Sequence, residues 1–305
     1  MRKPNKLNIN DLVGIVAPSS PIDQQYLDDC VKALESLGYR VILGESTKSS
    51  YKGYLAGTDE IRAKDINDMF GNDEIKGIFC LRGGYGSCRI MDKIDWDLLK
   101  SNPKIFVGYS DITNIHMMIN KKCDFISYHG PMVASNMRTK FDEYTKDSLI
   151  RTLDMNEDLF FQNPQGEELA VLVDGKSEGE LVGGNLALIV ASIGTEYEID
   201  TKGKILFIEE VGENTYRVDR MLHQLVHSGL IQKSKGILIG DFTNCNQRNE
   251  NEFTVMELFN DIIKPLNIPT LFNIKSGHDF PMATLPMGAF TTIDTGNKTI
   301  KFEVK

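Results

Sequence analysis

Three side chains that could together perform nucleophilic catalysis stand far apart in the sequence: Ser110, Glu209 and His278. The stretch Ile105–Asp111 (IFVGYSD) is an apolar run that ends in Gly-Tyr-Ser-Asp and leads into a helical pattern. Gly108 permits the tight backbone of a strand-to-helix corner. A serine at such a corner exposes its hydroxyl beside a helix N-terminus, where serine hydrolases carry their nucleophile. In the alternative interpretation, Ser110 or Asp111 only caps the helix that follows.

A serine nucleophile needs a base, and the base needs a carboxylate that orients it. His278 follows a predicted strand in a glycine-containing loop, Ser-Gly-His-Asp, and loop residues in that position are often functional. Glu209 and Glu210 end another predicted strand in the same way, and Ser-Glu-His is a chain order used by hydrolases with open α/β sheets. The remaining histidines are weaker candidates: His116 on the helix after the corner, His129 in a loop of structural character, and His223 with His227 on one helix face.

A glycine cluster follows the strand predicted over residues 78–81. The sequence Arg82-Gly83-Gly84-Tyr85-Gly86 would leave backbone N–H groups open to a ligand. It matches neither the dinucleotide-binding GxGxxG pattern nor a Walker A loop, and a simple tight turn remains the alternative. No HExxH, CxxC or comparable set of ligands occurs in the sequence, so we expect neither a metal centre nor another cofactor.

The first half of the chain alternates strands with helices. Strands are predicted over residues 12–17, 40–43, 78–81 and 105–107, and amphipathic helices begin near residues 26 and 58. Such alternation is typical of βαβ units in a parallel, doubly wound sheet. In that architecture ligands bind beyond the carboxyl ends of the strands, which is where the glycine cluster and the serine corner lie.

The pattern weakens in the middle of the chain and then starts again. We predict a helix over residues 186–193, a second amphipathic helix that ends at Gly229, and a third over residues 255–263. Strands are predicted over residues 205–208, 237–239 and 270–274, followed by a C-terminal hairpin that turns at Gly296-Asn297. The expected organisation is an N-terminal domain (1–160), a linker (161–178) and a smaller α/β domain (179–305).

The composition limits the possible partners and the compartment. The chain has 305 residues and a net charge of −9, so it lacks the basic footprint that nucleic acid requires. Its five cysteines are scattered, which favours free thiols in a reducing compartment. We find no leader-like N-terminus and no run of 18 apolar residues. We therefore expect a cytoplasmic protein without membrane or nucleic-acid partners.

These motifs, together with His129-Gly130-Pro131-Met132 and Gly183-Gly184-Asn185-Leu186, resemble the LD-carboxypeptidase family of serine peptidases. The resemblance covers nearly the whole chain. It implies a flavodoxin-like N-terminal domain, a smaller α/β C-terminal domain and a homodimer. It also implies that the substrate is a small peptide, a cytoplasmic murein tetrapeptide, from which the enzyme removes a terminal D-alanine during cell-wall recycling.

The resemblance also implies a role for each motif. Ser110 corresponds to the nucleophile, Glu209 to the carboxylate and His278 to the general base. The family's oxyanion hole uses backbone N–H groups from the residue after the nucleophile and from the glycine loop. Here these are Asp111 and either Gly83 or Gly84, and the sequence does not decide between the two glycines.

An exopeptidase must also hold the free carboxylate of its substrate, and a cation suits that task. Arg82 is our candidate, with a structural salt bridge as the alternative. Three other functions compete with the peptidase: a microcin C immunity hydrolase, a binding protein without catalysis, and an ordinary α/β-hydrolase esterase. The immunity hydrolase needs an aromatic platform, but the only tryptophan, Trp96, is far from the C-terminal loops. The esterase needs a full GxSxG elbow, and Ile112 replaces its second glycine.

Overall fold

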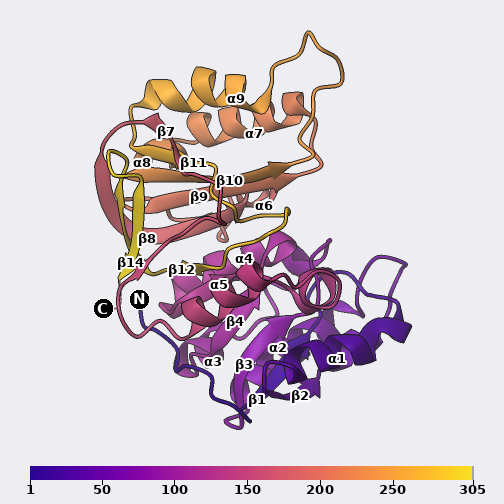
Figure 1. Cartoon of the computed structure of the whole chain (residues 1–305). Coiled ribbons are helices and arrows are strands. Elements are labelled where there is room, and N and C mark those ends of the chain that lie inside the picture. The colour runs from indigo at the N-terminus through magenta and orange to yellow at the C-terminus, as the bar shows by residue number, and fades with distance from the viewer. Residues whose placement is uncertain (304–305) are drawn as a thin grey trace. The chain divides into compact units, whose positions relative to one another are not determined.

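The computed structural model describes residues 1–303, which form two compact α/β units (Figure 1). Unit 1 comprises Met1–Met155 and Thr284–Pro286, and unit 2 comprises Asn156–Ala283 and the described residues from 287 to 303. The predicted class, an α/β protein with a flavodoxin-like parallel sheet in its N-terminal domain and a second α/β domain, is confirmed. Val304 and Lys305, the end of the predicted C-terminal domain, lie outside the described residues.

Unit 1 is built on a six-stranded sheet in the order β12-β5-β4-β3-β1-β2. The five strands β1 to β5 pair in parallel, and their order 2-1-3-4-5 is that of flavodoxin-like folds. The strand bounds are β1 Leu12–Val16, β2 Arg40–Leu43, β3 Ile75–Cys80, β4 Ile105–Gly108, β5 Ser127–His129 and β12 Leu285–Met287.

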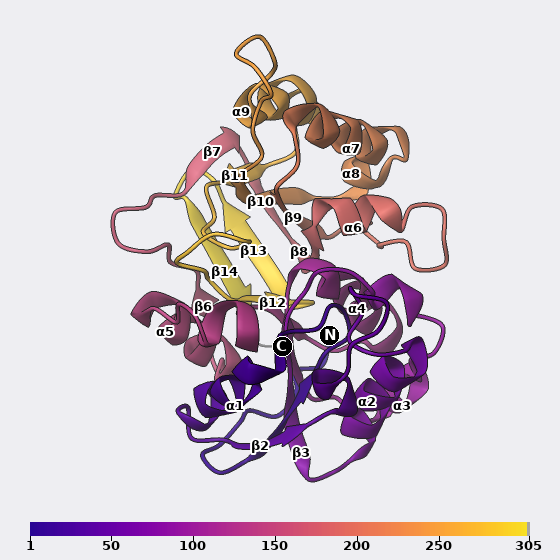
Figure 2. The same cartoon turned by 90° about the vertical axis from the view of Figure 1, so that its right-hand side faces the viewer.

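Helices cover both faces of this sheet, with α1 and α5 on one side and α2 and α3 on the other (Figure 2). Because both faces are covered, the strands are apolar on both sides, and Ile15, Phe79 and Phe106 are fully buried. The helix bounds are α1 Leu27–Glu35, α2 Asp59–Gly71, α3 Trp96–Ser101, α4 Thr113–Met118 and α5 Glu143–Leu153.

Unit 2 contains an eight-stranded sheet in the order β6-β14-β13-β8-β9-β10-β11-β7. The central strands β8 to β11 are parallel, and the flanking strands pair antiparallel. The predicted C-terminal hairpin is present as β13 and β14. The strand bounds are β6 Leu159–Phe160, β7 Ala170–Val173, β8 Lys176–Asn185, β9 Ile205–Val211, β10 Gly236–Thr243, β11 Thr270–Phe272, β13 Phe290–Asp294 and β14 Thr299–Glu303.

The segment 161–178, which we expected to be a linker, contains β7 and the start of β8. Glycines obscure β8 in the sequence, but the structure shows why they are needed. At Gly183 the backbone has a φ of +130°, and a Cβ there would lie 1.9 Å from the carbonyl oxygen of Phe207 on β9. Only a residue without a side chain permits this close approach of two strands.

The helices of unit 2 are α6 Leu186–Ala191, α7 Thr215–His227, α8 Leu230–Lys233 and α9 Val255–Leu258. None of the helices within residues 1–303 is long and apolar enough to cross a membrane. The five cysteines are unpaired, and of these only Cys88 is exposed.

Candidate active site

Ser110 occupies a strained corner between β4 and α4 in unit 1. Its φ is +64°, a left-handed conformation that costs a non-glycine residue about 1–2 kcal/mol. Strain of this kind concentrates at functional sites. Tyr109 and Ile112 hold the N-cap positions of the 3₁₀ turn Ser110–Ile112 and of α4, and neither cap is made by a side chain. The corner is therefore not explained by helix capping.

A buried histidine supports the corner from behind. His116 Nε2 donates to the Gly108 carbonyl at 2.8 Å, which leaves Nδ1 to accept from the Ser127 hydroxyl at 2.8 Å. Burial lowers the pKa of His116 to about 4, so the ring is neutral near pH 7. This histidine has a structural role, and the carbonyl that it holds lies two residues before Ser110.

The glycine loop after β3 packs against Ser110. A Cβ placed on Gly83 would lie 2.8 Å from Ser110 Cβ and 2.9 Å from its Oγ. A Cβ on Gly84 would instead meet Ser20, 2.4 Å from the hydroxyl oxygen. Of the two glycines that the sequence left open, Gly83 is thus the one whose Cα approaches the serine side chain.

The Asp111 side chain ties neighbouring loops to the corner. Its buried carboxylate accepts from the Ser19 hydroxyl at 2.6 Å and from the Ser87 N–H at 2.8 Å. Burial raises the pKa of Asp111, and these hydrogen bonds partly oppose that shift. The fully buried Arg62 donates to the carbonyls of Pro18 and Gly86 in the same loops. The loops after β1 and β3 are thus fixed by buried polar contacts.

Glu209 and His278 form a hydrogen-bonded pair in unit 2. Glu209 Oε2 lies 2.7 Å from His278 Nδ1, and the glutamate is completely buried. Its other oxygen, Oε1, is buried and has no hydrogen-bond partner among the described residues. Burial lowers the pKa of His278, but the charge and hydrogen bond of Glu209, with help from Glu210 and Asp241, raise it above the ordinary 6.5.

Glu210 points to the opposite face of β9 and has a different set of partners. Its carboxylate accepts from the Asn185 side chain at 3.0 Å and from the backbone N–H groups of Ala187 and Val211, both at 2.8 Å. Burial raises its pKa despite these bonds. Glu210 therefore anchors the start of α6, whereas Glu209 contacts the histidine.

Asp241 is a charged neighbour of this pair that our sequence analysis missed. Its N–H donates to the Ser276 carbonyl at 3.1 Å, and a Cβ on Gly277 would lie 3.2 Å from both Asp241 Cβ and Glu209 Oε2. Burial raises the pKa of Asp241 to about 6, although Lys275 Nζ lies 3.7 Å from Oδ1. The signal was available, because Asp241 ends the apolar run of β10 just as Glu209 ends that of β9.

The other candidates lie elsewhere. The rings of His223 and His227 meet edge to face on the surface of α7, with centroids 5.8 Å apart, and His129 is buried at the end of β5. Within residues 1–303 no cluster of three His, Cys, Asp or Glu side chains could hold a metal ion. Arg82 is half-buried after β3, and Nη1 reaches the Pro21 carbonyl at 3.4 Å. No salt bridge of Arg82 occurs in the described part of the chain.

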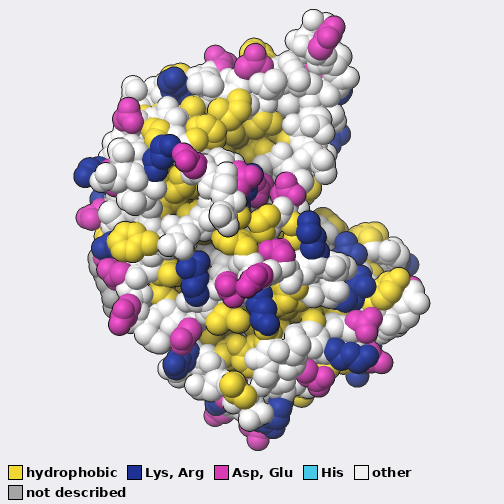
Figure 3. Space-filling view, viewed as in Figure 1, with side chains coloured by type: hydrophobic (Ala, Val, Ile, Leu, Met, Phe, Trp, Pro, Cys, Tyr) yellow, Lys and Arg dark blue, Asp and Glu magenta, His cyan; other side chains and the backbone are white. Residues whose placement is uncertain are grey.

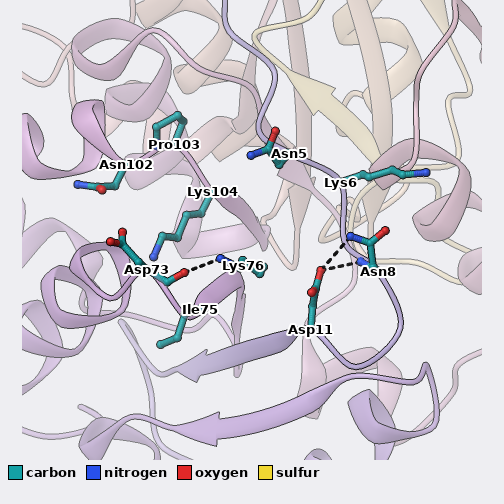
Figure 4. A pocket seen from close by; sticks show the side chains of 10 residues that line it. All are labelled: Asn5, Lys6, Asn8, Asp11, Asp73, Ile75, Lys76, Asn102, Pro103 and Lys104. Carbon is teal, nitrogen blue, oxygen red and sulfur yellow. Dashed lines mark hydrogen bonds between the residues drawn. The ribbon is translucent and has the colours of Figure 1, made fainter.

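A cavity of about 510 Å³ in unit 1 is not a candidate site (Figure 4). Its lining residues Asp11, Ile75 and Lys104 stand at the amino ends of β1, β3 and β4, away from the edge where parallel sheets bind ligands. The buried Lys104 ammonium donates to the carbonyls of Met69 and Asn72. Those bonds, together with burial that lowers its pKa to about 8, give Lys104 a structural role.

The structure thus brings Ser110, Asp111 and Gly83 together at one edge of unit 1. It pairs Glu209 with His278 at the carboxyl end of the central strands of unit 2. The first half is a serine at a strained corner beside a glycine loop, and the second is an imidazole held by a buried carboxylate.

Comparison with known proteins agrees with these features. Residues 13–130 match the LD-carboxypeptidase N-terminal domain, and residues 178–293 match the LD-carboxypeptidase C-terminal domain. The protein named probable murein peptide carboxypeptidase of Bacillus subtilis (strain 168) is 41% identical over 303 residues, which cover 99% of this chain and 94% of the relative.

Two solved structures are similar over almost the full length. The muramoyltetrapeptide carboxypeptidase from Oxalobacter formigenes is 28% identical with a TM-score of 0.83, covering 95% of this chain and 97% of that one. The microcin C7 self immunity protein MccF is 25% identical with a TM-score of 0.91, covering 99% and 98%. The predictions of family and of an enzyme are confirmed. The chain belongs to the LD-carboxypeptidase family of peptidases.

Proposed function

We propose that this protein is a serine carboxypeptidase that removes the terminal D-alanine from murein tetrapeptides by cleaving an L,D-peptide bond. Ser110, His278 and Glu209 act as nucleophile, general base and orienting carboxylate. The observation that carries the proposal is the 2.7 Å hydrogen bond between Glu209 Oε2 and His278 Nδ1. It supports a catalytic role because it determines which ring nitrogen can take up a proton.

In the neutral imidazole one nitrogen carries the proton and the other accepts. The Glu209 carboxylate accepts from Nδ1–H, so Nε2 is the unprotonated nitrogen, which carries the lone pair. The proposal requires Nε2 to accept the Ser110 hydroxyl proton as the serine attacks the carbonyl carbon. The buried Glu209 charge then stabilises the imidazolium that forms.

The serine attack generates a tetrahedral intermediate with a negatively charged oxygen. We assign its stabilisation to the N–H groups of Asp111 and Gly83, and the approach of Gly83 to Ser110 favours Gly83 over Gly84. Collapse of the intermediate expels the D-alanine amine, which takes the proton from His278. Water then hydrolyses the acyl-enzyme by the same route in reverse.

The murein substrate is inferred from the relatives. One is named a probable murein peptide carboxypeptidase and another a muramoyltetrapeptide carboxypeptidase. We further propose that the enzyme acts on small peptides in the cytoplasm during cell-wall recycling, that it is a homodimer, and that Arg82 contacts the substrate.

The likeness to a microcin C7 immunity protein supports a second candidate, cleavage of the amide in aminoacyl-nucleotide antibiotics. This alternative requires an aromatic platform for the nucleotide base, and the position of the only tryptophan does not support one. Trp96 begins α3 of unit 1, where its indole N–H donates to the Met91 carbonyl at 3.0 Å.

Parallel assays distinguish the two activities. The purified protein is incubated with a murein tetrapeptide and, separately, with an aminoacyl sulfamoyl adenosine, and release of D-alanine and cleavage of the amide are measured. We expect efficient turnover of the tetrapeptide alone, abolished by Ser110→Ala. Comparable turnover of the nucleotide would favour the second candidate, and unchanged activity of the Ser110 variant would refute both.

A further inference from the structure

A cavity of about 330 Å³ lies in unit 1 beside the glycine loop that contacts Ser110. Two arginines, Arg82 and Arg138, face it together. Its remaining lining is a mixture of apolar and small polar side chains: Ile22, Asp23, Tyr26, Ala134, Ser135 and Thr139.

Three loops at the carboxyl edge of the sheet build this cavity. Tyr26 follows β1, Arg82 follows β3, and Arg138 follows the π-helical turn Val133–Met137 after β5. The Ala134 N–H donates to the Leu81 carbonyl at 2.8 Å, which ties this turn to the residue before Arg82. The Arg138 guanidinium lies 4.2 Å from the centre of the Tyr26 ring. Stacking of this kind orients the planar group and leaves its edge available for hydrogen bonds.

Neither arginine has a carboxylate partner in the described part of the chain. Charged side chains of both signs are interspersed over the face shown in Figure 3, and Arg62 and Arg89 both pair with Asp59. In contrast, Arg138 Nε is buried without a hydrogen-bond partner among residues 1–303, and Arg82 has only the 3.4 Å contact with a carbonyl.

Asp23, the acidic residue that lines this cavity, accepts hydrogen bonds from Gln25 and pairs with neither arginine. Asp23 accepts from the Gln25 N–H at 3.1 Å and from the Gln25 side chain at 2.6 Å, where it caps a helical turn. Two guanidinium groups that share one cavity repel each other when no anion lies between them. A planar carboxylate bound between them would offset that repulsion and accept hydrogen bonds from the guanidinium groups.

We propose that Arg82 and Arg138 together form the subsite that binds the free C-terminal carboxylate of the peptide substrate. This inference rests on the proposed function and adds to it a second arginine, a stacking tyrosine and a defined cavity. In a peptide, about 4 Å separates the scissile carbonyl carbon from the carboxylate carbon of the terminal residue. The loop spans a comparable distance: Gly83 lies against Ser110, and a Cβ on the next residue, Gly84, would lie 3.9 Å from Arg82 Nη2.

The apolar residues in the cavity suit a small terminal side chain. Ile22 and Ala134 offer contacts for a methyl group beside the two cations, as the terminal D-alanine would require. The subsite should therefore distinguish a free carboxylate from a neutral amide, because the carboxylate is charged and has two acceptor oxygens, whereas the amide has one and adds N–H donors that arginine cannot accept.

The test compares two tetrapeptides that differ only in ending in a free acid or in an amide. Calorimetry with the inactive Ser110→Ala protein measures their binding without turnover. We expect the acid to bind about 10- to 100-fold more tightly, as for hydrogen bonds to charged groups. Arg138→Met and Arg82→Met, each made in this background, should reduce the preference to less than about threefold. Arg138→Lys should keep part of it.

Arg40→Met is the matched control, since Arg40 starts β2 at the opposite end of the sheet and should leave the preference unchanged. Melting curves verify that each variant is folded. Equal weakening of acid and amide in Arg138→Met would indicate a merely structural role and overturn the inference. So would an intact preference in both methionine variants. In either case cleavage of the tetrapeptide by the wild-type protein, and its loss in Ser110→Ala, would still support the proposed function. Absence of cleavage by the wild-type protein would overturn both.

Discussion

The two halves of the proposed machinery are built from different kinds of interaction. Around Ser110 the protein relies on backbone geometry: a positive φ, a glycine in close approach, and carbonyls held by His116 and Arg62. Around His278 it relies on charge, with a buried carboxylate in contact and a second one, Asp241, nearby. Backbone geometry therefore positions the nucleophile, whereas nearby negative charges set the protonation of the base. Substitutions in the two halves should accordingly impair activity for different reasons.

The largest expected effect is loss of the nucleophile. Ser110→Ala should lower kcat about 10⁶-fold, as removal of a triad serine does, and should leave the fold intact. Ser110→Gly should be equally inactive but more stable than the alanine variant by about 1 kcal/mol, since glycine adopts a positive φ without strain. Chemical denaturation measures that difference. Ser101→Ala, at the exposed end of α3, is the control. Equal stability of the two Ser110 variants would show that the corner is not strained.

The two adjacent glutamates allow a sharper comparison within unit 2. Glu209→Gln should reduce kcat about 10⁴-fold, because the amide no longer favours the required tautomer of His278. Glu210→Gln should mainly reduce stability, by about 1–3 kcal/mol, since an amide cannot accept all the hydrogen bonds at the start of α6. Steady-state kinetics and chemical denaturation of both variants measure these effects. A loss of kcat in Glu210→Gln and of stability alone in Glu209→Gln would show that the roles of the two acids are the reverse of those proposed.

Gly83 and Gly277 are counterparts in the two halves. Gly83→Ala should push the new Cβ into Ser110 and lower kcat on the order of 100-fold, the cost of a displaced oxyanion donor. Gly277→Ala has looser contacts, 3.2 Å to Asp241 Cβ and to Glu209 Oε2, but it must adopt a φ of +148°. It should therefore destabilise the His278 loop as well as slow turnover. If Gly83→Ala kept full activity, the glycine would not contribute to the oxyanion hole.

The smallest expected effect concerns pH. The base must be neutral to accept a proton, so kcat/KM should fall as the pH drops through the pKa of His278, which lies above 6.5. Asp241 raises that pKa through its negative charge. Asp241→Asn should therefore move the acid limb of the profile to lower pH by a fraction of a unit, with kcat at pH 8 nearly unchanged. An acid limb that stays in place would exclude Asp241 from the electrostatics of the base.

Much of the fold could be predicted from the sequence, because apolar runs and helical spacing are local signals. Arg40–Leu43 is a strand with the predicted bounds, and the C-terminal hairpin turns where expected. The strand β8 was missed because its glycines are needed for close contacts with residues that only the folded sheet brings near, such as Phe207 beside Gly183. In the segment 161–178 the edge strand β7 is short and its surroundings are polar, so the sequence carries no clear strand pattern there and resembles a linker.

The candidate residues could also be identified in the sequence, and the family resemblance assigned the carboxylate role to Glu209, but spacing and periodicity alone did not separate Glu209 from Glu210. Alternation along β9 implies that Glu209 and Glu210 face opposite ways, yet which of them contacts the histidine depends on where the loop at Gly277 lies. Arg138 belongs to none of the motifs identified in the sequence. Its position beside Arg82 is supported by a backbone hydrogen bond between Ala134 and Leu81, which lie 53 positions apart in the sequence.

The contacts that hold the Ser110 corner have a practical consequence. They come from its neighbours, the Asp111 carboxylate and the ring of His116, so the geometry of the corner does not depend on the serine hydroxyl itself. The side chain at position 110 can therefore be replaced without loss of the backbone geometry around it. A cysteine placed there would inherit the same exposed, tightly turned backbone, which makes this residue a natural attachment point for covalent probes that trap the acyl form of the protein.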